Sequence, residues 1–336
     1  MKTQTIVLNQ ERNVTLTIYL QEVGEKYLRI QTRPAALILP GGGYQFCADS
    51  EGDPVALEYL NAGFQAFVLR YSVGKDAVWP NPLDDYENAM EYILAHAEKW
   101  NICPEKIAVV GFSAGGHLAA CAATMAKHKP SAAILGYAAT MEKFISICAP
   151  NAPGPVDAVD RKTCPCFVFA TRNDKVVPAE NSLRFINALY TNGISFESHI
   201  YGYGPHGFAT VNPTVQDPSA LCSRAPHWVA DSMEWLWDIW GDIDAEPDNK
   251  PRCARTVGGD YGEFLSVECT TDCILKNESA KELLHSIGMG ELISNMEGLK
   301  GSNIVLHQIL EYAQLSEEQI TGIDTMLSEI PNLELK

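Results

Sequence analysis

The stretch Ile107-Ala-Val-Val-Gly-Phe-Ser-Ala-Gly-Gly-His117 decides how the rest of the chain is interpreted. Its first four residues are apolar and predict a buried strand, and the alanine-rich run 114–125 predicts a helix. Between them lies the G-x-S-x-G motif Gly111-Phe-Ser-Ala-Gly115, in the strand-turn-helix context that this motif requires. Glycines on both sides let Ser113 occupy a sharp, strained turn from which its hydroxyl projects. The motif predicts a nucleophilic serine, and the alternative is an incidental serine in a glycine-rich junction.

The chain around this motif alternates between strand and helix patterns. Apolar runs predict strands at 5–8, 15–19, 35–39, 64–71, 107–110, 132–137, 166–171 and 195–201, and helices at 54–62, 81–100, 114–125, 179–192 and 225–240. This alternation is typical of a mostly parallel sheet that helices cover on both faces. The sequence therefore predicts an α/β fold.

The composition changes after residue 242. Residues 243–259 are polar and contain several prolines and glycines, which predicts a linker. Residues 260–336 carry apolar positions at helical spacing, enough for three or four short helices, and contain no motif with recognisable chemistry. We therefore expect a catalytic α/β domain over 1–242, a linker over 243–259 and a small all-α domain over 260–336.

Two features of the α/β domain allow two interpretations each. The tryptophan stripe of the predicted helix 225–240 favours packing against the sheet over a sugar-binding platform. The segment 138–163 is rich in proline and alanine and has no clean periodicity. It is either a lid or substrate-binding loop, or a plain connection, and the sequence leaves that choice open.

Charge and composition limit the partners of this 336-residue chain. Its net charge of −17 disfavours nucleic acid and anionic membranes as partners. The first residues lack the apolar core of a signal peptide, and no segment reaches transmembrane length. Ten cysteines are too few for a disulfide scaffold of this length, and Cys164-Pro-Cys166 lacks the second pair of a metal site. We expect a cytoplasmic protein that acts on a small molecule without metal or cofactor; its oligomeric state is not readable, and a homodimer would be unsurprising.

Three loops supply the groups that acyl transfer by serine requires, namely a hydroxyl, a base and a carboxylate that orients the base. Ser113, Asp174 and His206 occur in this chain order, and each follows a predicted buried strand. Because loops at the carboxyl ends of parallel strands share one edge of the sheet, we expect the three side chains to meet there. The rivals are His227 for the base, and Asp157 and Asp160 for the carboxylate.

The glycine loop Pro40-Gly-Gly-Gly-Tyr44 follows the predicted strand 35–39. Three successive glycines are entropically costly, but their bare N–H groups can approach a ligand oxygen closely. The loop therefore predicts an oxyanion hole, with a flexible loop as the alternative. His117 lies one helical turn after Ser113 and points along its helix, which favours a core position for this ring.

Five blocks of the sequence, in this order, resemble the α/β-hydrolase esterases of bacterial carbohydrate metabolism. They are Leu39-Pro-Gly-Gly-Gly-Tyr44, Phe67-Val-Leu-Arg-Tyr71, Gly111-Phe-Ser-Ala-Gly-Gly-His-Leu-Ala119, Asn173-Asp-Lys-Val-Val-Pro178 and Gly204-Pro-His-Gly207. The resemblance covers roughly residues 5–240 and includes acetyl-xylan-esterase-like and feruloyl-esterase-like proteins, which are related to the hormone-sensitive-lipase type. Residues 260–336 are similar to the small helical domain at the C-termini of some clostridial glycoside hydrolases and esterases, which would add association with sugar-processing partners.

The resemblance implies the α/β-hydrolase fold and a role for each residue of the site. Ser113 would be the nucleophile, with Asp174 and His206 as its partners. The amides of Gly42, Gly43 and Ala114 would be the oxyanion donors, and Tyr44 and His117 are candidates for substrate binding.

Residues and resemblance together predict a serine carboxylester hydrolase. It would remove short acyl groups, above all acetyl, from sugars or xylo-oligosaccharides through an acyl-enzyme intermediate. One alternative is a prolyl-oligopeptidase-like peptidase, although such enzymes normally carry a large N-terminal gating domain. The other is a non-catalytic hydrolase fold used as a binding module, which would gain nothing from a strained elbow.

Overall fold

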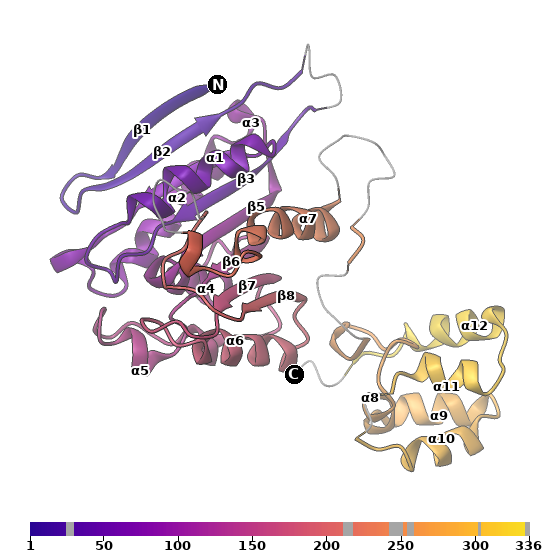
Figure 1. Cartoon of the computed structure of the whole chain (residues 1–336). Helices are drawn as coiled ribbons and strands as arrows, with labels where there is room; N and C mark the ends of the chain where they lie inside the picture. Colours follow the sequence, from indigo (N-terminus) through magenta and orange to yellow (C-terminus); the bar gives the residue numbers. More distant parts are fainter. Residues whose placement is uncertain (25–29, 211–217, 242–250, 254–258, 302–303, 333–336) are drawn as a thin grey trace. The chain divides into compact units, whose positions relative to one another are not determined.

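The computed structural model describes residues 1–24, 30–210, 218–241, 251–253, 259–301 and 304–332. It divides into two compact units, Met1–Arg255 and Thr256–Lys336 (Figure 1). Most of the predicted linker 243–259 lies outside the described residues. None of the described helices combines the length and the apolar composition that a membrane span requires.

The first unit is built on a sheet that has eight strands within the described residues, in the order β1-β2-β4-β3-β5-β6-β7-β8. The strands are β1 (Lys2–Asn9), β2 (Val14–Leu20), β3 (Arg33–Leu39), β4 (Gln65–Arg70), β5 (Ile102–Phe112), β6 (Ala132–Gly136), β7 (Cys166–Thr171) and β8 (Phe196–Tyr201). β2 pairs antiparallel with β1 and with β4, and every other pair is parallel. The predicted α/β fold with a mostly parallel sheet is therefore confirmed.

Helices cover both faces of this sheet. The longer ones are α1 (Asp53–Asn61), α2 (Asn81–Ala95), α4 (Ser113–Met125), α6 (Glu180–Thr191) and α7 (Trp228–Trp240), and the short ones are α3 (Ala97–Trp100) and α5 (Glu142–Ile145). Strand residues alternate between two cores: Leu37 and Val109 pack with α2, α4 and α6, whereas Ile38 and Val110 pack with α1 and α7. A parallel sheet buried on both faces explains why its central strands read as continuous apolar runs.

Two predicted helices differ from the structure by more than one residue at an end. The predicted helix 81–100 is two helices, because the chain leaves the helical conformation at His96, whose ring Nδ1 lies 2.8 Å from the Tyr92 carbonyl oxygen. The predicted helix 225–240 opens with the 3-10 turn Ala225–His227. Its tryptophans pack in the core, as expected, and Trp228 stacks on Phe169 with ring centroids 4.4 Å apart.

The second unit is helical, with five helices among its described residues, so the prediction of three or four was too low. They are α8 (Thr271–Lys276), α9 (Glu278–Ser286), α10 (Gly290–Glu297), α11 (Leu306–Tyr312) and α12 (Glu317–Leu327). They enclose a separate apolar core that includes Ile274, Leu284 and Leu310. Side-chain caps at Thr270, Asn277 and Ser316 begin three of these helices, which is why short segments can form here.

Candidate active site

Ser113 occupies a strained turn between β5 and α4. Its φ of 53° is a left-handed conformation that non-glycine residues rarely adopt. A Cβ at Gly111 would lie 2.2 Å from the Gly115 carbonyl oxygen, and one at Gly115 would lie 2.1 Å from the Leu39 carbonyl oxygen. The two glycines therefore let α4 pack against β5 and against the glycine loop, which places Ser113 beside that loop.

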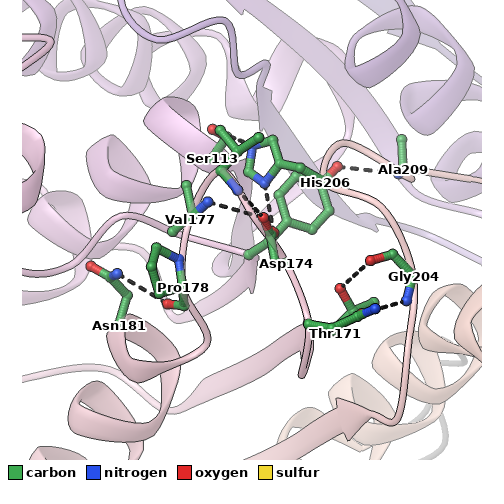
Figure 2. Close-up of polar contacts among 12 residues, drawn as sticks. Ser113, Thr171, Asp174, Val177, Pro178, Asn181, Gly204, His206 and Ala209 are labelled. Carbon is green, nitrogen blue, oxygen red and sulfur yellow. Dashed lines mark hydrogen bonds and ion pairs between the residues drawn. The ribbon is translucent and has the colours of Figure 1, made fainter.

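Asp174 and His206 reach Ser113 from the loops after β7 and β8, and Figure 2 shows the three side chains in a row. His206 Nε2 lies 2.9 Å from Ser113 Oγ, and His206 Nδ1 lies 2.7 Å from Asp174 Oδ2. The other carboxylate oxygen of Asp174 accepts hydrogen bonds from the Val176 and Val177 amides at 2.8 and 3.0 Å. A carboxylate held in this way accepts the Nδ1–H and leaves Nε2 free to accept the serine proton.

The loops that carry Asp174 and His206 are tied to each other. The Thr171 hydroxyl donates to the Gly204 carbonyl, and the Gly204 amide donates to Asn173 Oδ1, both at 2.9 Å. Figure 2 shows the bond between Thr171 and Gly204 at the base of the His206 loop. Contacts from the end of β7 therefore help to fix the position of His206, in addition to β8, which precedes its loop.

The three alternative residues, Asp157, Asp160 and His227, have no part in this hydrogen-bonded row. Asp160 accepts hydrogen bonds from the Lys162 amide and the Thr163 hydroxyl within its own turn. Asp157 and His227 lie in 3-10 turns and are exposed. None of the three has a hydrogen bond to Ser113 or His206 among the described contacts.

The glycine loop borders the same pocket as the serine. Gly42, Gly43 and Ala114 line a cavity of about 370 Å³ together with Ser113 and His206. Gly42 and Gly43 have φ angles of 127° and 61°, so the loop needs glycine for its backbone conformation as well. The amide of Ala114 is one of the donors that the first turn of a helix leaves without an intrahelical partner. The structure thus brings the predicted oxyanion donors to the pocket.

Tyr44 and His117 were predicted to contact substrate, and the structure contradicts this. Both side chains are fully buried, so neither has a surface that a substrate could touch. The Tyr44 hydroxyl lies 2.7 Å from His117 Nδ1, and His117 Nε2 lies 2.8 Å from the Pro153 carbonyl oxygen. Burial lowers the pKa of His117 to about 4, against the opposing effect of its bond to Pro153. Tyr44 and His117 therefore form a buried, hydrogen-bonded pair, which agrees with the core position that the sequence favours for the His117 ring.

The segment 138–163 forms one wall of the pocket, which favours the substrate-binding-loop interpretation over a plain connection. Phe144, Ile145, Ile147 and Cys148 from this segment line the cavity. Ile147 is 78% exposed, an unusual state for an isoleucine that borders an apolar cavity. The periodicity of the segment could not show this, because its described helices are short, namely α5 and the 3-10 turn Pro155–Ala158.

Sequence reasoning missed Glu51, which lies in the 3-10 turn Asp49–Glu51 before α1. Its side chain is 4% exposed and lines the pocket beside Ser113. Glu51 Oε2 accepts the Gly41 N–H at 2.7 Å, and Oε1 accepts the Tyr137 hydroxyl, also at 2.7 Å. An acidic residue just before a helix is ordinary in sequence, so no local pattern marks Glu51 as part of the site.

One group of potential metal ligands occurs among the residues that the structure describes, and it belongs to the second unit. The ligand atoms of Asp260, Cys269 and Cys273 lie within 4.8 Å of one another. Three ligands are one fewer than a structural zinc site uses, and both sulfurs belong to the apolar core of that unit. The expectation of no metal and no cofactor stays a prediction.

Comparisons with known proteins agree with this fold and site. Residues 16–147 match the family model BD-FAE. An alignment of 213 positions, which covers 54% of the chain, is 32% identical to the endo-1,4-beta-xylanase B of Butyrivibrio fibrisolvens and covers 33% of that protein. A second alignment, of 195 positions, covers 51% of the chain, is 29% identical to the acetylxylan esterase of Xylanibacter ruminicola and covers 40% of it. The chain thus spans only a third to two fifths of the length of these curated relatives.

Among solved structures, the α/β-hydrolase enzyme MGS-M1 from a Medee basin deep-sea metagenome library is 42% identical, with a TM-score of 0.66. The match covers 70% of this chain and 97% of that one. A parallel sheet that presents a serine elbow, a histidine and an aspartate at one edge defines the α/β-hydrolase class. The chain belongs to the α/β-hydrolase family, and within it resembles the carbohydrate esterases.

Proposed function

We propose that the chain is a serine carboxylester hydrolase that removes short acyl groups, with acetyl as the expected group, from sugars or xylo-oligosaccharides. The observation that carries the proposal is the continuous hydrogen-bonded row from Asp174 through His206 to Ser113, in a pocket bordered by the glycine loop. The acetylxylan esterase among the relatives supports the choice of acyl group and of sugar. A small acylated sugar or oligosaccharide is therefore the proposed substrate.

In the proposed mechanism, Ser113 Oγ attacks the ester carbonyl while His206 Nε2 takes its proton. Asp174 stabilises the imidazolium that forms. The amides of Gly42, Gly43 and Ala114 stabilise the oxyanion of the tetrahedral intermediate. His206 then donates this proton to the leaving alcohol. In the second half of the reaction, water attacks the acyl-enzyme while His206 takes a proton from it, and His206 returns the proton to Ser113 as the acid leaves.

The test compares hydrolysis of chromogenic acetyl, butyryl and octanoyl esters, acetylated xylo-oligosaccharides and a prolyl amide. The native protein is expected to prefer acetyl esters. Ser113→Ala is expected to lose at least about 10³-fold in kcat and all labelling by a fluorophosphonate probe. Ser286→Ala, which changes an exposed serine on α9, is the matched control and should keep full activity.

Each alternative has its own outcome in this test. Preference for the prolyl amide would replace the esterase proposal with the peptidase. Absence of both hydrolysis and labelling in the native protein would favour the binding-module alternative. Full activity in Ser113→Ala would remove the serine from the reaction.

A further inference from the structure

A chain of hydrogen bonds joins the glycine loop to the His206 loop from beneath the pocket. It begins at the Gly41 amide, passes through both carboxylate oxygens of Glu51 and reaches the Tyr137 hydroxyl. That hydroxyl also accepts the Ala209 amide at 3.1 Å, a bond drawn in Figure 2. Gly41 precedes the expected oxyanion glycines, and Ala209 follows His206. The hydrogen bonds therefore connect the two loops whose relative position the proposed reaction depends on.

Close packing makes these contacts specific to Glu51. A Cβ at Gly41 would lie 2.6 Å from Glu51 Oε2, so the carboxylate occupies the space that any other residue at position 41 would fill. A Cβ built at Gly207 would lie 3.7 Å from Glu51 Oε1, so the same carboxylate lies near the residue after His206. Glu51 therefore fills the space beside Gly41 and lies close to the His206 loop.

Tyr137 extends the effect of Glu51 to the imidazole itself. Its ring packs edge-on against His206, with ring centroids 4.9 Å apart and an interplanar angle of 67°. The ring is fully buried, so a change in its hydroxyl contacts has little space in which to relax. Fixing the Tyr137 hydroxyl therefore also fixes the ring against which His206 packs.

The Glu51 carboxylate lies buried beside Ser113 although burial disfavours its negative charge. Burial raises the pKa of Glu51, and its bonds from Tyr137 and Gly41 and the nearby His206 oppose that rise. A buried group of this kind costs stability, so its presence beside Ser113 calls for a reason other than folding.

We propose that Glu51 is a positioning residue, which acts through Gly41 on the glycine loop and through Tyr137 on His206. The inference rests on the proposed function, because it assigns Glu51 a task in the same reaction. Both loops matter most in the transition state, where the oxyanion and the imidazolium exist together. Loss of Glu51 should therefore lower kcat and leave KM almost unchanged.

The experiment compares Glu51→Gln and Tyr137→Phe with the native chain. A glutamine amide can satisfy only one of the two donors, Gly41 N–H or Tyr137 O–H, and carries no charge. Tyr137→Phe keeps the ring against His206 and removes the bonds to Glu51 and Ala209. Glu58→Gln on the exposed side of α1 and Tyr190→Phe on α6 are the matched controls, since both side chains are exposed.

Four quantities are measured with the full chain: kcat and KM for a chromogenic acetyl ester, inhibition by phenylboronic acid, and the melting temperature at pH 7. We expect kcat to fall about 10- to 100-fold in Glu51→Gln and about 10-fold in Tyr137→Phe, with KM within about three-fold of native. Inhibition should weaken by the same factor as kcat/KM, because the boronate adduct resembles the tetrahedral intermediate. The melting temperature of Glu51→Gln should not fall.

A native kcat in Glu51→Gln would overturn the inference, and so would a loss that appears in KM alone or in proportion to a lower melting temperature. If Glu51→Gln does not fold, Tyr137→Phe decides, and a native kcat in that variant overturns the inference. Ser113→Ala separates the two proposals. If Ser113→Ala is inactive and Glu51→Gln is native, only the role of Glu51 fails; if Ser113→Ala is active, both proposals fail.

Discussion

Burial sets the protonation state of the His117 imidazole. His117 is fully buried, accepts the Tyr44 hydroxyl at Nδ1 and donates from Nε2 to the Pro153 carbonyl, a pattern that fits a neutral ring. His206 sits at the pocket, with its side chain 16% exposed, and bonds to a carboxylate instead. Two histidines that the sequence places near one serine thus have different tasks, because one faces carbonyl and hydroxyl oxygens and the other faces Asp174.

The neutral state of His117 makes stability depend on pH. The pKa of this ring falls from 6.5 to about 4 on folding, so between these values the unfolded chain binds a proton that the folded chain excludes. The free energy of unfolding should therefore fall as the pH falls from 6.5 to 4, by roughly 3 kcal/mol from this side chain. His117→Gln, which cannot take up the proton, should lose less stability over the same window.

Urea unfolding of the native chain and of His117→Gln at pH 7 and pH 4 measures this difference. His227→Gln, which changes an exposed histidine of the same unit, is the control and should follow the native chain. Equal losses in native protein and His117→Gln would contradict the neutral, buried state of the ring.

The junction of β5 with α4 shows how one element is held by its small residues. α4 is buried along almost its whole length, and its first turn lies against the end of β3. The contact is between backbones, since the Leu39 and Pro40 carbonyl oxygens fill the space beside Gly115. Replacing neighbouring side chains with smaller ones therefore cannot relieve a clash at Gly115.

Gly115→Ala should therefore destabilise the first unit by about 3 kcal/mol and abolish esterase activity, because the elbow would move away from the glycine loop. The control is Gly322→Ala in the middle of α12, where a Cβ would meet nothing within 4 Å. That change should stabilise its helix by about 0.5–1 kcal/mol. Thermal unfolding and ester hydrolysis measure both effects, and an active, stable Gly115→Ala would refute the packing argument.

At the scale of the whole molecule, the chain contains two units with separate apolar cores. Every residue assigned to the reaction, from Gly41 to His206, lies in the unit Met1–Arg255. The core of the second unit is formed by residues between Leu265 and Leu327. The residues of the proposed reaction and the core of the helical unit therefore belong to different compact units.

A chain shortened to residues 1–255 should keep kcat/KM for a chromogenic acetyl ester within about two-fold of the full-length value, since it retains both cores that flank the sheet. Ser113→Ala in the shortened chain is the control for background hydrolysis. A soluble shortened chain without activity would show that the helical unit takes part in catalysis.

Much of the first unit could be predicted from sequence, because its signals are local. Continuous apolar runs located the buried strands, and β7 was predicted with the bounds that the structure shows, Cys166–Thr171. The antiparallel placement of β1 and β2 at one edge could not be predicted, since strand order depends on pairing between distant segments. The break at His96 was missed as well, because apolar periodicity continues through it.

The sequence by itself determined the α/β class and the three loops that carry Ser113, Asp174 and His206, since periodicity and turn glycines are properties of neighbouring residues. Only the tertiary structure decided that Tyr44 and His117 are closed to substrate, and that Glu51 bonds to Gly41, ten residues away, and to Tyr137, 86 residues away. The physical reason is that burial and hydrogen-bond partners arise when distant elements pack, and no local pattern records them.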